Sequence, residues 1–158
     1  MLQGNKSKLH VFNEIRSEQE LYDQKEHEEI RRKFIGGIPE RSHLDDLKRL
    51  ALNGVKGAAY DFAHYSIARH LEYSEEALVL LKNYGSDLYA THLQGAIAEF
   101  QGDEDTALYC YLKNAKKGFG TSTIAVKNLV YENPELKRYK DGEQIEKVLQ
   151  VFYKNYCC

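Results

Sequence analysis

The chain has 158 residues, of which 29% are charged and 42% are hydrophobic, and its net charge is −2. This composition excludes wholesale disorder, and the length suits one domain with a sizeable core. No apolar run approaches the roughly 20 residues that a membrane-spanning helix needs, and the N-terminal residues lack the apolar core of a signal peptide. We therefore expect a cytoplasmic globular protein that has no membrane partner.

The charge is distributed unevenly along the chain. Residues 51–110 carry three basic side chains against nine acidic ones, whereas residues 111–158 carry nine basic against five acidic. An acidic middle would attract a basic partner, although ordinary solvated helix faces would give the same counts.

Apolar periodicity predicts helices along most of the chain and no strands. An intermittent apolar stripe that includes Leu21 and Ile30 predicts one or two helices within residues 7–35, ended by Gly36, Gly37 and Pro39. Residues 1–41 are thus expected to form a charged helical arm or cap, and residues 42–158 a helical-repeat domain. Further helices are expected near 42–52, 56–71, 75–84, 87–101, 104–117, 121–131 and 142–155, which gives about seven to eight helices in total.

Several helix ends have recognisable signals. Ser42 is expected to cap the first repeat helix, with Asp45 at the spacing of a capping box. Ser74 is expected to cap the helix at 75–84, and Gly85 and Gly118 are expected to end their helices as C-terminal glycines.

The clearest pattern lies between Gly95 and Gly118. Small residues at Gly95, Gly102, Ala107 and Ala115 alternate with large ones, which is typical of two antiparallel helices in close contact around a Gly-Asp turn. Ala77 matches Ala107 at a spacing of 30 residues, and a period near 30 indicates helical-hairpin repeats.

The segment 107–118, ALYCYLKNAKKG, resembles the second helix of the Sel-like repeat, a relative of the tetratricopeptide repeat. Asn114 replaces the first of the paired alanines in that family, and Cys110 replaces an aromatic residue. The resemblance covers about 87–118 well and 56–85 weakly. It implies an all-α fold of antiparallel hairpins stacked as a short α-solenoid; the alternative is an irregular helical bundle that contains one such hairpin. The matching residues are Ala107, Leu108, Tyr111, Ala115 and Gly118.

The resemblance also implies a non-enzymatic scaffold that holds a partner protein or peptide, possibly basic, in a groove formed by the first helices of successive hairpins. For Phe62 and Phe100, the alternative to a place in this groove is that both are core residues. Carried over by position, the residues that would face the partner are Phe62, Ser66, Arg69, His70, Tyr89, His92, Glu99 and Phe100.

Two other functions stay open. One is a small immunity- or antitoxin-type inhibitor whose acidic middle masks a basic toxin. The other is a small helical enzyme that uses His64, His70 or His92 together with Glu99.

Specific chemical motifs are missing from the sequence. The six histidines do not form a metal motif, and residues 118–123, GFGTST, lack the full phosphate-binding loop and predict a turn between helices. We expect no catalytic residues, no metal, no cofactor and, in a slightly acidic chain, no nucleic acid. Three cysteines do not suit a disulfide scaffold, so Cys110 is expected in the core and Cys157 and Cys158 at an exposed end.

Overall fold

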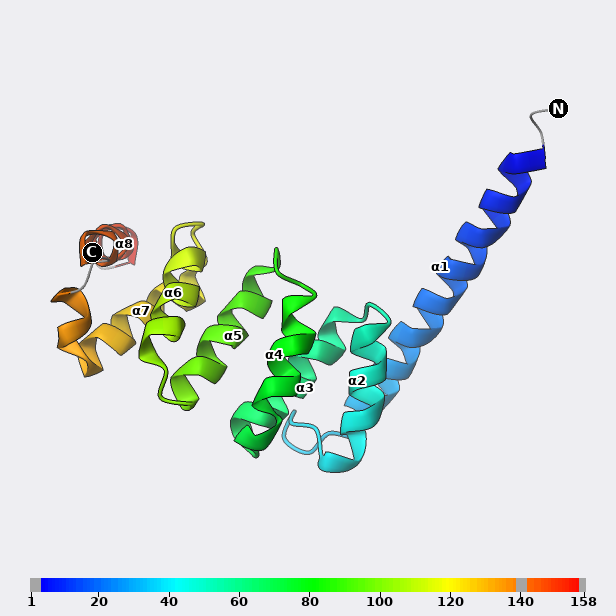
Figure 1. Ribbon diagram of the computed structural model, residues 1–158, viewed down its shortest axis with the longest axis horizontal. Coiled ribbons are helices and arrows are strands. Elements are labelled where there is room, and N and C mark those ends of the chain that lie inside the picture. The colour runs from blue at the N-terminus through cyan, green and yellow to red at the C-terminus, as the bar shows by residue number, and fades with distance from the viewer. Residues whose placement is uncertain (1–3, 139–141, 157–158) are drawn as a thin grey trace.

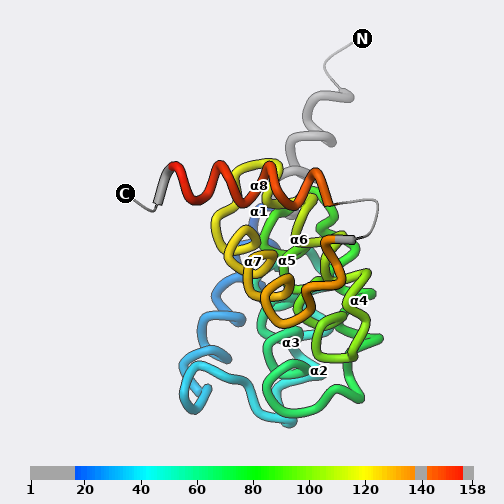
Figure 2. The backbone as a smooth tube through the Cα atoms, turned by 90° about the vertical axis from the view of Figure 1, so that its left-hand side faces the viewer, coloured from blue at the N-terminus to red at the C-terminus, as the bar shows by residue number. Residues whose placement is uncertain are grey.

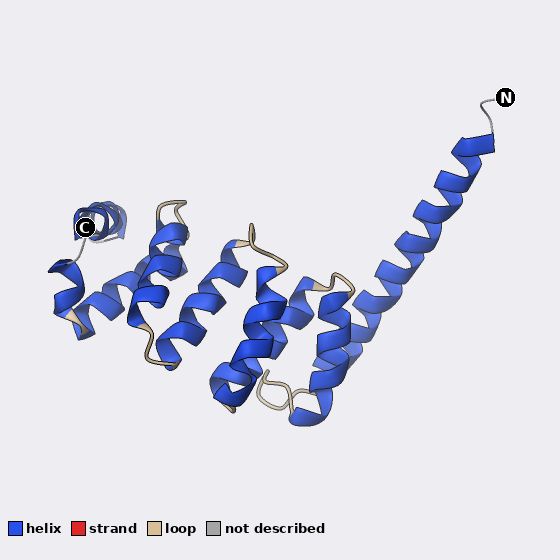
Figure 3. Cartoon of the chain, viewed as in Figure 1, coloured by secondary structure: helices blue, strands red, loops and turns tan. Residues whose placement is uncertain are grey.

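The computed structural model describes residues 4–138 and 142–156, with side chains for 17–137 and 142–154. Within these residues the fold is all-α, as predicted, and contains no strand (Figure 3). No described helix is both long and apolar enough to cross a membrane. Cys157 and Cys158 lie outside the described residues. The α-helices are α1 (Gly4–Arg31), α2 (Leu44–Leu52), α3 (Lys56–Ala68), α4 (Ser74–Lys82), α5 (Leu88–Phe100), α6 (Glu104–Ala115), α7 (Gly120–Glu132) and α8 (Gly142–Tyr156).

The helices follow one another in a row along the long axis of the molecule (Figure 1). From α2 to α8 each helix packs against the next one in the chain, and α3 also packs against α5. Helix α8 lies across the end of the row that is opposite to α1 (Figure 2). Short 3₁₀ helices precede α2 (Arg41–His43), α4 (Leu71–Tyr73) and α8 (Pro134–Arg138).

Three of the helices share one register. α3, α5 and α7 are each 13 residues long and begin at residues 56, 88 and 120, at equal intervals of 32. Four positions, the third, fourth, tenth and eleventh, are buried in all three helices, whereas the sixth, seventh and eighth are not buried in every one. The third residue in each, for example, is Ala58, Ala90 and Ser122.

The intervening helices have a register of their own. α2, α4 and α6 begin at residues 44, 74 and 104, at equal intervals of 30. Their fourth residues, Leu47, Ala77 and Ala107, are fully buried. Ala77 and Ala107, which match in the sequence, are thus the same buried position of their respective helices.

The predicted hairpin around Gly102 is confirmed. A Cβ atom on Gly95 would lie 2.7 Å from Cε1 of Tyr111, so only glycine lets α5 and α6 approach this closely. Gly102 has a φ of +82°, and the Asp103 side chain accepts a hydrogen bond of 3.1 Å from the Thr106 N–H at the start of α6. Gly118, with a φ of +83°, follows the end of α6 as expected.

The predicted cap at Ser42 is wrong. Instead, Glu40 and His43 form a capping box at the start of the 3₁₀ turn that precedes α2. This turn contains Ser42, so α2 begins only at Leu44 and Asp45 lies in its first turn.

The predicted ends of α4 also differ from those in the structure. Ser74 is the first helical residue and follows the N-cap Tyr73, and its buried Oγ atom lies 3.0 Å from that of Ser66. A bond to the neighbouring helix thus replaces the cap. At the other end, the C-cap is Asn83, and Gly85 lacks the positive φ of a C-terminal glycine.

The buried hydrophobic residues form two clusters that meet in α5. One runs from Ile30 to Ile97 and the other from Ala98 to Leu149. Helix α1 joins the first cluster through Ile30. The apolar stripe predicted for α1 is only partly correct, since Leu21 is 53% exposed and the buried positions include Asp23 and His27.

Candidate partner-binding surface

Aromatic side chains of α3, α5 and the start of α7 meet in a continuous series. The Tyr60 and Tyr89 rings meet edge to face with centroids 4.9 Å apart, and Tyr89 stacks on His92 at 6.2 Å. His92 in turn meets the ring of Phe119 at 6.1 Å, and His64 meets Tyr89 at 5.9 Å. All five side chains are half-buried, so each keeps an accessible edge. We call this set, Tyr60, His64, Tyr89, His92 and Phe119, the aromatic row.

Asp87, the N-cap of α5, holds one end of the aromatic row in place. Its carboxylate accepts hydrogen bonds from the Tyr60 hydroxyl, from Lys56 Nζ at 2.9 Å and from the Ala90 N–H at 2.8 Å. Burial of Asp87 opposes its ionisation, but these three donors outweigh burial and lower the pKa of the carboxyl. Burial, reinforced by Asp87, raises the pKa of Tyr60. The Tyr60 hydroxyl is therefore a stable hydrogen-bond donor.

A histidine links each pair of neighbouring helices among α1, α3, α5 and α7. The atoms joined are His27 Nε2 and Asp61 Oδ2 at 2.6 Å, His64 Nε2 and the Tyr89 hydroxyl at 2.8 Å, and His92 Nδ1 and the Ser122 hydroxyl at 2.9 Å. Burial lowers the pKa of both His64 and His92. Near neutral pH these two imidazoles are uncharged, and the aromatic row carries no cation of its own.

The eight residues predicted to face a partner do not lie together. Tyr89 and His92 belong to the aromatic row. Phe62 and Ser66 are buried, so their predicted place on a partner-facing surface is wrong. Phe62 faces the interior because its position on α3 points toward Tyr73, whose ring it meets edge to face.

The other predicted residues lie toward the C-terminal ends of their helices. Arg69 and His70 are exposed in the connection that follows α3. Glu99 and Phe100 end α5, about 15 Å along the helix axis from Tyr89. Phe100 is 59% exposed, so the alternative that it is a core residue is also wrong.

Glu99 and Phe100 line a hollow of about 260 Å³ between the end of α5, the start of α6 and the end of α7. Glu104 and Glu132 also line it, so three acidic residues surround one opening. Glu99 is fixed there because its Oε2 accepts a hydrogen bond of 2.7 Å from the Tyr111 hydroxyl. We call this site, lined by Glu99, Phe100, Glu104, Leu129, Glu132 and Asn133, the acidic hollow.

Sequence reasoning did not assign Tyr60, Asp87 or Phe119 to the surface. The interval of 32 residues could have identified Tyr60, since it occupies the position of His92 one helix earlier. Asp87 carried the ordinary signal of an N-cap before α5. We find no comparable signal for Phe119.

The enzyme alternative required a histidine beside Glu99. Among the described contacts, Glu99 is bonded to Tyr111, whereas His64 and His92 are bonded to Tyr89 and Ser122. His70 lies 3.9 Å from Glu72. Within the described part of the chain, no hydrogen bond or ion pair joins Glu99 to any of the three histidines.

Comparison with protein-family models, with curated proteins and with solved structures gives no match. Within the described residues, no three His, Cys, Asp or Glu side chains are grouped so that they could hold a metal ion. The case for a binding surface is therefore built on the geometry of the aromatic row and the acidic hollow.

Proposed function

We propose that the protein is a non-enzymatic interaction module that holds a segment of a partner protein across α3, α5 and α7. The observation that carries this proposal is the aromatic row, whose residues are partly exposed and, apart from Phe119, hydrogen-bonded across α3, α5 and α7. Rigid aromatic groups lose little conformational entropy on binding, and such groups dominate the centres of interfaces. The order of the helices suits a short α-solenoid of the Sel-like type.

The surface also indicates the chemistry of the partner. On α7, Ile124 occupies the position of Tyr60 and His92 in the earlier helices and is 47% exposed. The acidic hollow adds three acidic residues, Glu99, Glu104 and Glu132, near the C-terminal end of α5. A segment that carries an apolar side chain and a lysine or arginine would match both features.

The acidic hollow also favours a more specific candidate, a small immunity- or antitoxin-type inhibitor. Such a protein would mask the basic surface of a toxin, and the excess of acidic residues in 51–110 would speed their encounter. In the cytoplasm this electrostatic attraction would be screened by salt but not abolished.

Affinity capture with quantitative mass spectrometry tests the proposal. The double variant Ile124→Ser/Tyr131→Ser changes two exposed residues of α7, whereas Leu52→Ser/Val79→Ser makes a matched change on α2 and α4. We expect the α7 variant to reduce capture of a specific partner, and its affinity for that purified partner, by about tenfold or more. The control variant should stay within about twofold of wild type.

Two results would contradict the proposal. One is equal partner binding by the α7 variant and by the control. The other is a chemical turnover that is abolished by alanine at His64, His70, His92 or Glu99, because this would favour the enzyme alternative.

A further inference from the structure

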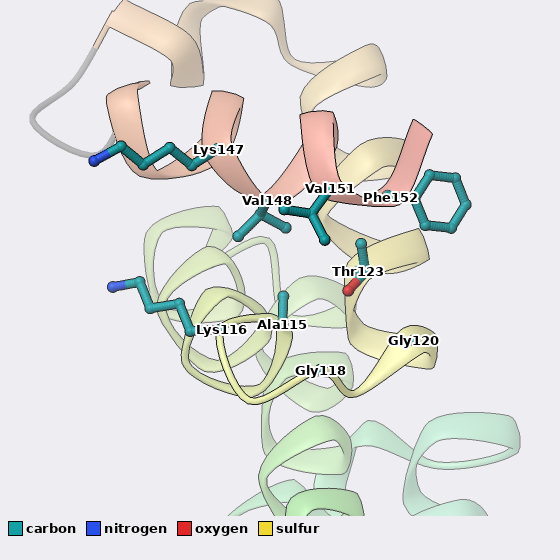
Figure 4. A pocket seen from close by; sticks show the side chains of 9 residues that line it. All are labelled: Ala115, Lys116, Gly118, Gly120, Thr123, Lys147, Val148, Val151 and Phe152. Atoms are coloured by element: carbon teal, nitrogen blue, oxygen red, sulfur yellow. The ribbon is translucent and has the colours of Figure 1, made fainter. Parts of the chain in front are cut away.

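A second surface, opposite in charge to the acidic hollow, lies between α6 and α8. A hollow of about 340 Å³ lies between α6 and α8 (Figure 4). A second hollow of about 480 Å³ adjoins it, since Lys116 lines both. Lys147 lines the first, and Lys113 and Lys117 line the second. We call the two hollows together the lysine groove.

The positive charge of the lysine groove is not neutralised within the described part of the chain. No acidic side chain is among the described residues that line either hollow. None of these four lysines forms an ion pair with another described residue, and the nearby Glu146 already pairs with Lys137 at 3.0 Å. Clustered like charges of this kind attract an anionic partner.

The floor of the lysine groove is apolar. Val148 and Val151 of α8 face Ala115 of α6 across the first hollow, and Phe152 lies at its edge (Figure 4). Lys116 and Lys147 extend toward the same side of the hollow. Val151 is 59% exposed. A ligand that brought only negative charge would leave this apolar area uncovered.

We infer that the lysine groove binds an acidic segment of a partner protein in which a leucine or phenylalanine side chain stands beside carboxylates. The carboxylates would pair with Lys116 and Lys147 while the apolar side chain covers Val148 and Val151. An extended peptide fits better than a compact ligand, because the two open hollows continue into one another along α6. Gly118 and Gly120, which flank Phe119 of the aromatic row, line the first hollow, so the two sites adjoin at the start of α7. The charge preference of the lysine groove is opposite to that of the acidic hollow.

Fluorescence anisotropy with a labelled hexapeptide, EDLFED, tests the inference. We expect saturable binding to the wild-type protein and an affinity at least about tenfold lower for Lys116→Glu/Lys147→Glu. The control Lys33→Glu/Lys82→Glu changes the net charge equally at exposed positions outside the groove, and should alter the affinity less than about twofold. Circular dichroism of both variants checks that the helices are intact.

Changes to the peptide and to the apolar floor separate the alternatives. EDSSED, which lacks the apolar side chains, and NQLFQN, which lacks the carboxylates, should both bind more weakly than EDLFED. Val151→Ser should weaken the binding of EDLFED without affecting that of EDSSED. Equal binding of EDSSED and EDLFED would overturn the inference, since the groove would then bind any anion. Tighter binding of a single-stranded oligonucleotide of equal charge, equal losses in both double variants, or no saturable binding of EDLFED would overturn it as well.

Discussion

The Nε2 atom of His27 lies 2.6 Å from Oδ2 of Asp61, and both side chains are buried. Arg31 Nε lies 3.4 Å from the same carboxylate oxygen. A Cβ atom on Gly57 would lie only 2.7 Å from Cε1 of His27, so the glycine makes room for the imidazole. Helix α1 is thus joined to α3 by a polar contact, and its Ile30 belongs to the first hydrophobic cluster.

Replacing His27 with alanine should lower the free energy of unfolding by about 2–4 kcal/mol. The change leaves the buried Asp61 carboxylate with only the half-exposed Arg31 as a charged partner, and it opens a cavity beside Gly57. Urea unfolding followed by circular dichroism measures the loss. Lys25→Ala on the exposed side of α1 is the control and should change stability by less than about 0.5 kcal/mol. Equal stability of the two variants would mean that α1 does not dock on α3.

Replacing Gly95 with alanine should destabilise the hairpin by about 1–3 kcal/mol. The added methyl group would lie within 3.1 Å of both Tyr111 and Cys110, so α5 and α6 must separate. Gly120→Ala is the matched control, because nothing lies within 4 Å of its added Cβ. Thermal unfolding of the two variants distinguishes close packing from a general effect of glycine in helices. A gain in stability for Gly95→Ala would contradict the close approach of the two helices.

Replacing Asn114 with alanine should lower the free energy of unfolding by about 2 kcal/mol. The buried Asn114 amide donates to the Leu88 carbonyl at 2.6 Å and to the Ser122 hydroxyl at 3.1 Å, and so joins α5, α6 and α7. Alanine at this position would leave both acceptors without this donor. Lys113→Ala, one residue earlier and exposed, is the control for urea unfolding. A free energy of unfolding that is nearly unchanged in Asn114→Ala would show that these hydrogen bonds add little to stability.

The sequence predicted the helices and the α5–α6 hairpin because their signals are local. Apolar periodicity marks a helix within its own turns, and the small residues at Gly95 and Ala107 mark close contact across a short loop. The bonds between helices could not be predicted in this way. Asp61 lies 34 residues from His27, and nothing near either residue indicates that they meet. Phe62 illustrates the same limit, since position within a repeat did not reveal which side of α3 is buried.

Stability should fall as the pH drops below about 6.5, because of His64 and His92. Burial lowers the pKa of both imidazoles, and for His64 it outweighs the attraction of Asp61 for the charged form. The unfolded chain then binds more protons than the folded one between the lowered pKa values and about 6.5. The stabilisation is therefore complete above this range and is lost as the pH falls through it.

The urea midpoint at several pH values from about 7.5 to about 5 measures this effect. The wild-type midpoint should decrease toward acid, whereas that of His64→Gln/His92→Gln should vary less over the same range, since glutamine keeps a hydrogen-bonding group but does not titrate. The lowered carboxyl pKa values of Asp87 and Asp103 act only below their ordinary value of 3.8 and do not contribute in this range. The contrary result is a wild-type midpoint that varies with pH no more than that of the double variant. It would mean that burial does not keep the two imidazoles neutral, and that their bonds to Tyr89 and Ser122 survive protonation.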